Sequence, residues 1–194
     1  VGAVLDHYGA EDVTIIGVSL GGELCMRAAA MEPRIRRVVS WSVLPSIYGA
    51  LMADKPAEIR AKLEHWLDEN NRDAILDLYA GLAEREPLFR WSIQHSNYAY
   101  GTSDVYEYLQ KARAFTMEPV AEQITQDVLL LSAREDLLVD FGLYKQEIDL
   151  LKNTRSLEFA VPGRALNGQA HCNMGNTKYM LDLILNWNDR VLER

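Results

Sequence analysis

Apolar and polar residues form two patterns along the chain, and each pattern predicts a different kind of element. Short, nearly continuous apolar runs bounded by turn residues indicate buried strands. Four such runs predict strands: Asp12–Gly17, Arg36–Trp41, Val128–Ser132 and Ser156–Val161. Longer segments beside these runs, Ala- and Leu-rich or amphipathic, predict helices. They are Val1–Tyr8, Leu20–Met31, Phe141–Leu151 and Lys178–Leu192.

Strands that alternate with helices predict βαβ units and a parallel sheet. The stretch between the second and third strands breaks this alternation, because it has no strand pattern and is rich in aromatic residues. It predicts four helices: Ala57–Asn70, Asp73–Ala83, Glu84–Ser96 and Asp104–Phe115. We therefore expect an α/β core formed by residues 1–44 and 119–194, with a helical cap over 45–118. We expect the cap to close over an apolar pocket and also to have a small core of its own that stabilises it.

A Gly-x-Ser-x-Gly motif lies at residues 17–21, between the first predicted strand and the helix that follows it. This context indicates a nucleophile elbow, a tight strand-to-helix turn that exposes a serine hydroxyl above the sheet. Larger side chains at Gly17 and Gly21 are expected to collide with the turn. A phosphate-binding turn is disfavoured because the motif lacks the P-loop lysine and the dinucleotide-binding glycine pattern. We predict Ser19 as the nucleophile and the Leu20 N–H as an oxyanion donor.

A serine nucleophile needs a base and a carboxylate that orients the base, in the chain order Ser, acid, His for this kind of elbow. Asp136 follows the third strand and is the candidate acid, with Glu135 and Asp140 as neighbours that could replace it. Of the four histidines, only His171 follows the last strand, so it is the candidate base. We also expect an apolar substrate pocket, and four residues are candidates for lining it: Trp41, Tyr48, His95 and Tyr98.

The composition of the chain argues against several kinds of binding partner. The chain has 194 residues, 48% of them hydrophobic, which suffices for one compact domain. Its net charge of −8 argues against binding to nucleic acid or to an anionic membrane surface. Cys25 and Cys172 form neither a disulfide framework nor a zinc motif, so we expect reduced thiols, a cytoplasmic location, and no metal or cofactor.

Two motifs carry a family resemblance. Residues 17–41 and residues 168–176 (GQAHCNMGN) resemble the FrsA-like branch of the α/β hydrolases, which includes 2,6-dihydroxypseudooxynicotine hydrolase. The resemblance implies a serine triad of Ser19, Asp136 and His171 under a helical cap, acting on a small-molecule substrate without a cofactor. Some members cleave carbon–carbon bonds beside a ketone. The extra carboxylate that the pseudooxynicotine enzyme uses has no counterpart in 42–52, and Ala133 replaces a usual glycine.

The resemblance also implies further strands before the elbow. We therefore expect this chain to be the C-terminal part of an α/β-hydrolase fold, with strand 12–17 at an open edge. Either a missing N-terminal segment or a second copy of the chain would cover that edge. Three functions remain open: an ester or similar acyl hydrolase of a small apolar substrate, a C–C hydrolase of a diketone- or polyketide-like substrate, and a non-catalytic binding or regulatory protein.

Overall fold

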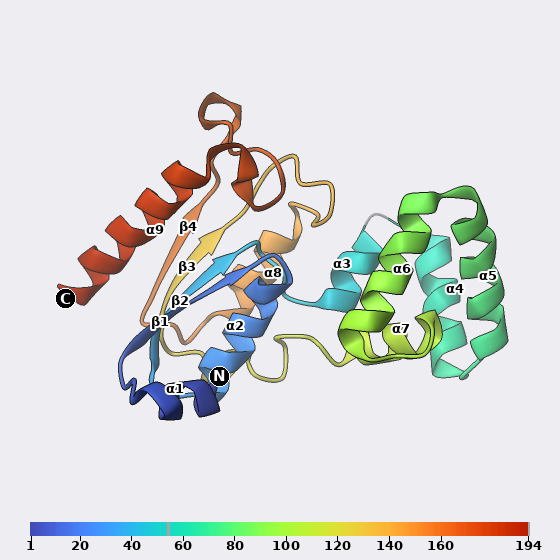
Figure 1. Cartoon of the computed structure of the whole chain (residues 1–194), viewed down its shortest axis with the longest axis horizontal. Coiled ribbons are helices and arrows are strands. Elements are labelled where there is room, and N and C mark those ends of the chain that lie inside the picture. Colours follow the sequence, from blue (N-terminus) through green and yellow to red (C-terminus); the bar gives the residue numbers. More distant parts are fainter. Residues whose placement is uncertain (54, 194) are drawn as a thin grey trace. The chain divides into compact units, whose positions relative to one another are not determined.

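Four parallel strands form one sheet in the order β1-β2-β3-β4 (Figure 1). They are β1 (Val13–Val18), β2 (Ile35–Trp41), β3 (Asp127–Leu131) and β4 (Ser156–Ala160). Val18 pairs with Trp41, and Trp41 pairs with Leu131, so the strands end nearly in register. Their carboxyl ends therefore meet at one edge of the sheet, where open α/β sheets place their sites.

Helices cover both faces of the sheet, as the alternation of strands and helices predicted. α2 (Leu20–Met31) and α8 (Leu143–Leu150) lie on one face, and α9 (Thr177–Leu192) lies on the other (Figure 1). Neighbouring strand residues point to opposite faces. Val38 and Leu130 accordingly join the core under α2 and α8, whereas Val39 and Leu131 join the core under α9. The expectation of a parallel sheet flanked by helices is confirmed.

The described residues, 1–53 and 55–193, divide into two compact units. The first, Val1–Ala50 with Thr116–Arg194, contains the sheet, and the second is Leu51–Phe115. The chain leaves and re-enters the sheet unit at one place, where Ser46 bridges Thr116 and the Met117 N–H donates to the Pro45 carbonyl at 2.9 Å. A helical insertion can therefore join the sheet unit at one point without interrupting the sheet.

The strand β1 lies at an edge of the sheet and pairs only with β2 among the described residues. Ile16 and Val18 are 44% and 47% exposed. The expectation that this strand lies at an open edge is confirmed, and the prediction that its apolar run is buried is wrong for Ile16 and Val18, because no described element covers these side chains. The preceding helix α1 (Gly2–Tyr8) ends at Gly9, whose positive φ of 61° suits a helix C-cap.

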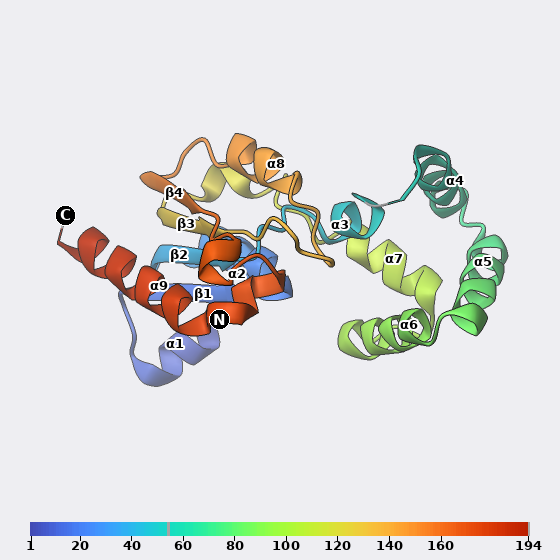
Figure 2. The ribbon, with the colours of Figure 1, turned by 90° about the horizontal axis from the view of Figure 1, so that it is seen from above.

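The helical unit differs from the prediction mainly at helix boundaries. Its helices are α4 (Ala57–Asp68), α5 (Arg72–Arg85), α6 (Pro87–Tyr100) and α7 (Val105–Arg113), and α5 packs against the other three (Figure 2). A helix was predicted from Glu84, but α5 extends to Arg85 and α6 begins at Pro87. Proline lacks an N–H and is favoured at the first position of a helix. The sequence also gave no sign of α3 (Ile47–Ala53), which crosses the boundary between the units.

Candidate active site

Ser19 occupies the turn between β1 and α2 in a strained backbone conformation. Its φ is 56° and its ψ is −121°, a region that residues with a side chain rarely adopt. The Ser19 N–H donates to the Trp41 carbonyl at 2.9 Å, which ties the turn to the end of β2. Strain held in place by surrounding structure is typical of a functional turn. Leu20 begins α2, so its N–H has no acceptor within that helix.

Two glycines make this turn possible, Gly17 and Gly22, whereas the motif suggested Gly17 and Gly21. A Cβ on Gly17 would lie 1.8 Å from the Gly21 carbonyl oxygen. A Cβ on Gly22 would lie 2.3 Å from the Ser42 carbonyl oxygen, whereas one on Gly21 would meet nothing within 4 Å. The expectation that Gly21 avoids a collision is therefore wrong for the described residues. Gly22 takes that role because α2 packs closely against the chain after β2.

This difference predicts opposite effects for two alanine substitutions. Gly17→Ala should lower the free energy of unfolding by more than about 3 kcal/mol, because its methyl group collides with rigid backbone. Gly21→Ala should change it by about 0 to +1 kcal/mol, because alanine is the better helix former. Urea denaturation of both variants measures the difference. Equal destabilisation by the two substitutions would contradict the packing described for the turn.

The structure brings Ser19, His171 and Asp136 together in one chain of hydrogen bonds. The Ser19 Oγ lies 2.8 Å from His171 Nε2, and His171 Nδ1 lies 2.7 Å from Asp136 Oδ2. The other carboxylate oxygen, Asp136 Oδ1, accepts hydrogen bonds from the N–H groups of Leu138 and Val139 at 2.8 and 3.1 Å. With the imidazole proton on Nδ1, the Nε2 lone pair faces the serine hydroxyl, as a general base requires.

The electrostatics of this chain favour an ionised acid. Burial acts to raise the pKa of Asp136, but its hydrogen bonds with His171, Leu138 and Val139 hold that pKa below its usual value. The hydrogen bond from His171 to Asp136 raises the pKa of the imidazole above its ordinary value. The carboxylate therefore stabilises a proton on His171, as it would when the imidazole takes a proton from serine.

The two alternative acids lie elsewhere. Glu135 is exposed and pairs with Arg164 through two hydrogen bonds of 2.5 and 2.6 Å. Asp140 is exposed too, and its carboxylate accepts from the Gly142 N–H at 2.7 Å. Of the three candidates that the sequence left open, only Asp136 contacts His171.

Asn173, which the sequence analysis did not single out, fixes the loop that carries His171. Its buried side-chain amide donates to the carbonyls of Ser132 and Gly168 at 3.1 and 2.5 Å. Its Oδ1 accepts from the Trp41 indole N–H at 3.2 Å. One side chain thus connects the ends of β2 and β3 to the histidine loop. A polar residue two positions after the candidate base was the available signal.

The four candidate pocket residues have different environments. Trp41 is 5% exposed and belongs to the core under α9, so its ring supports the sheet. Tyr48 is half-buried in α3 within the sheet unit. His95 and Tyr98 belong to α6 of the helical unit. The His95 ring stacks on the Trp91 ring with their centroids 5.1 Å apart, and Tyr98 is 87% exposed. Trp41 contacts the serine turn through its backbone carbonyl, which accepts the Ser19 N–H.

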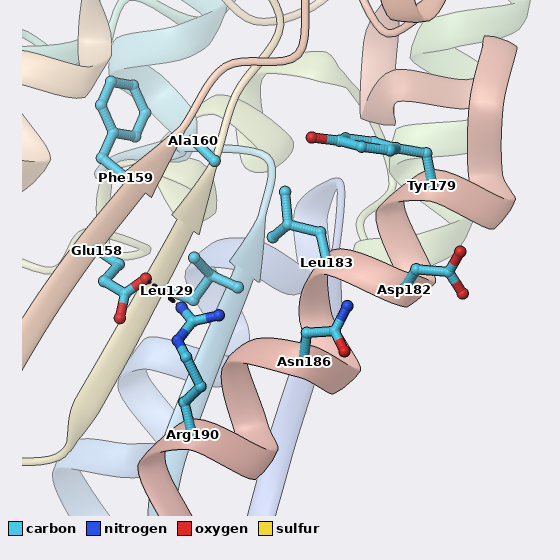
Figure 3. A pocket seen from close by; sticks show the side chains of 9 residues that line it. All are labelled: Leu129, Glu158, Phe159, Ala160, Tyr179, Asp182, Leu183, Asn186 and Arg190. Atoms are coloured by element: carbon cyan, nitrogen blue, oxygen red, sulfur yellow. Dashed lines mark hydrogen bonds and ion pairs between the residues drawn. The ribbon is translucent and has the colours of Figure 1, made fainter.

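A cavity of about 320 Å³ lies between β4 and α9 (Figure 3). Phe159 of β4 and Leu183 of α9 line it, and the Glu158–Arg190 ion pair of 2.7 Å spans it. The lining includes none of the three hydrogen-bonded residues, so this cavity is separate from the serine site. Within 1–53 and 55–193, no group of three or more His, Cys, Asp or Glu side chains could hold a metal ion. No helix in these ranges is long and apolar enough to cross a membrane.

Comparisons with known proteins agree with this architecture. Residues 1–164 match the model of the alpha/beta hydrolase fold family. The hydrolase acrC of Aspergillus aculeatus is 29% identical over 119 residues, which cover 55% of this chain and 27% of that protein. This chain thus spans about a quarter of the curated relative.

Solved structures show the same fold at low sequence identity. The α/β hydrolase GrgF from Penicillium sp. sh18 has a TM-score of 0.62 at 14% identity, over 97% of this chain and 69% of that one. The 2,6-dihydroxy-pseudo-oxynicotine hydrolase has a TM-score of 0.54 at 19% identity, over 88% and 39%. An esterase from Pyrococcus furiosus has a TM-score of 0.51 at 16% identity, over 99% and 57%. At these identities the likeness concerns the fold.

Proposed function

Because this chain belongs to the α/β-hydrolase fold family, we propose that it is the catalytic part of a serine hydrolase that cleaves an ester or similar acyl bond. The observation that carries the proposal is the hydrogen-bonded chain from Ser19 through His171 to Asp136 at the strained turn. Fold alone would not support an activity, since one fold hosts many functions.

The proposed reaction follows from the three side chains. Ser19 Oγ attacks the substrate carbonyl carbon while His171 Nε2 takes the hydroxyl proton, and the carbonyl oxygen becomes an oxyanion. The Leu20 N–H, at the positive end of α2, stabilises that oxyanion. His171 then gives its proton to the leaving group, which departs and leaves an acyl-serine. Water, deprotonated by His171, attacks this ester, and His171 returns the proton to Ser19 Oγ as the acyl–oxygen bond breaks, which releases the acid and the free serine.

We propose an apolar substrate with the helical unit as its cap. This unit supplies exposed aromatic side chains on α6, including Trp91 and Tyr98, which are 58% and 87% exposed. Aromatic side chains exposed to water indicate a surface that binds an apolar group. His95 stacks on Trp91 and would extend the same surface.

An ester substrate fits the site better than a carbon–carbon bond. The pseudooxynicotine enzyme of the resembled branch uses an extra carboxylate soon after its second strand for its C–C cleavage, and residues 42–53 contain no Asp or Glu. Comparing hydrolysis of p-nitrophenyl esters with cleavage of vinylogous ketones tests this choice. We expect turnover of the esters. Exclusive turnover of the ketones would favour C–C hydrolysis, and no turnover of either by the full-length protein would favour a binding protein.

A further inference from the structure

Two carboxyl groups are buried in the sheet unit and have no part in the proposed reaction. Glu23 of α2 and Glu147 of α8 are both 0% exposed. None of their four carboxyl oxygens has a hydrogen-bond partner of normal geometry. A buried, unpartnered carboxylate is costly, so these groups need a proton or a compensating charge.

The charged and titratable groups around Glu23 and Glu147 do little to offset the cost of burying two negative charges. The Arg27 Nε lies 3.5 Å from Glu23 Oε1, but the same guanidinium donates to the Thr116 carbonyl at 2.7 Å. Glu147 of α8 is close enough to Glu23 and to the buried thiol of Cys25, both on α2, to interact with them electrostatically. Like charges and burial both disfavour ionisation. Burial accordingly raises the pKa of Glu23 to about 7 and, aided by repulsion from Glu23, raises the pKa of Glu147 to about 8.

The pair lies against the segment that holds the serine turn. Glu147 faces the Ser40 hydroxyl and the Leu44 N–H, and the Ser40 hydroxyl donates to the Ser42 carbonyl at 3.1 Å. Ser40 also pairs with Gly17 across the sheet.

The residue beside Glu23 connects the pair to the turn from the other side. Gly22 fits so closely under Ser42 that a Cβ would lie 2.3 Å from its carbonyl oxygen. Trp41, between Ser40 and Ser42, accepts the Ser19 N–H at 2.9 Å. A shift of residues 40–44 would therefore move the backbone that positions Ser19.

We propose that Glu23 and Glu147 are positioning residues that each retain a proton, and that losing these protons shifts residues 40–44 and impairs the serine turn at alkaline pH. When both carboxyls are ionised, their repulsion and their missing hydrogen bonds favour separation of α2 and α8. The effect on Ser19 rests on its proposed role as nucleophile. The retained proton does not depend on that role.

The test combines a readout of the proton with a readout of Ser19. Infrared difference spectroscopy of the whole chain follows the carbonyl stretch of protonated carboxyls from pH 6 to pH 9.5. The rate of labelling by a fluorophosphonate probe is measured over the same range. Two variants are used, Glu147→Gln and Glu23→Gln, so that if one of them fails to fold the other still tests the proposal. Asp149→Asn is the matched control, because this carboxylate lies on α8 but is exposed.

The wild type and Asp149→Asn should show a protonated-carboxyl band that disappears near pH 8. Over the same pH range their labelling rate should fall by up to about 100-fold, the size expected when a reacting group is misplaced by about 1 Å. Glu147→Gln and Glu23→Gln should weaken the band and keep their labelling rate to higher pH. Absence of the band at pH 6 would overturn the proposal, as would an unchanged alkaline loss in both variants. If the band behaves as expected but no labelling occurs at any pH, the proposed nucleophile fails while the retention of protons by the two carboxyls stands.

The same pair predicts how stability depends on pH. In the unfolded chain these carboxyls ionise near their ordinary pKa of about 4.3, whereas the folded chain retains protons up to a pKa of about 7 to 8. The unfolded state therefore binds fewer protons across this window, so stability falls as pH rises from about 4.3 to 8 and then levels. Glu147→Gln should melt at a higher temperature than wild type at pH 8 and at about the same temperature at pH 4.5. A difference of equal size at both pH values would contradict the assignment.

Discussion

Replacing Ser19 with alanine should lower the turnover number for a p-nitrophenyl ester by about 10⁶-fold, because it removes the hydroxyl that lies 2.8 Å from His171 Nε2. The fold should survive, since alanine loses only the hydroxyl and its backbone can adopt the same turn. Circular dichroism and a melting curve verify folding, and steady-state kinetics measure the loss.

Ser103→Ala is a suitable control, because Ser103 lies on a bend before α7 in the helical unit. It should retain the wild-type turnover number within about twofold, as surface substitutions usually do. Ester turnover by Ser19→Ala within tenfold of wild type would show that another group performs the attack.

Replacing Asp136 with asparagine should lower the turnover number by about 10⁴-fold. The amide cannot supply the negative charge that stabilises the His171 cation, and it allows the wrong imidazole tautomer. The activity of the wild type requires neutral His171, whose pKa Asp136 raises. The acid limb of kcat/KM should therefore lie above the ordinary histidine pKa of about 6.5, and it should move to lower pH in Asp136→Asn.

Glu135→Gln is the matched control for this substitution, because Glu135 is adjacent in sequence but pairs with Arg164. Its pH profile should coincide with that of the wild type. An unchanged acid limb in Asp136→Asn would contradict the placement of this carboxylate against His171. If the acid limb shifts in Glu135→Gln instead, Glu135 rather than Asp136 orients His171, and our assignment of the acid is wrong.

Much of the site was predictable because it depends on where strands end. Ser19, Asp136 and His171 follow β1, β3 and β4, and parallel strands bring their carboxyl ends to one edge of the sheet. The sequence left Asp136, Glu135 and Asp140 open, because the three acids lie at most five positions apart on one loop. Only the loop's hydrogen bonds distinguish them.

The remaining features depend on packing between distant segments. Gly21 and Gly22 look equivalent in the sequence, and their difference arises from the close approach of Ser42 to α2. Glu23 and Glu147 resemble ordinary helix-surface acids, and their burial follows from how α2 and α8 pack on the sheet. Ile16 and Val18 match a buried strand by composition, yet their exposure depends on which elements lie beside β1.

The most direct test of the account identifies the atom that reacts. The chain is incubated with a fluorophosphonate probe and digested, and the modified peptide is sequenced by mass spectrometry. We expect one adduct, on Ser19, which is absent from Ser19→Ala and slowed in Asp136→Asn. An adduct on a different residue, or labelling of Ser19→Ala at the wild-type rate, would contradict the assignment of Ser19 as the nucleophile.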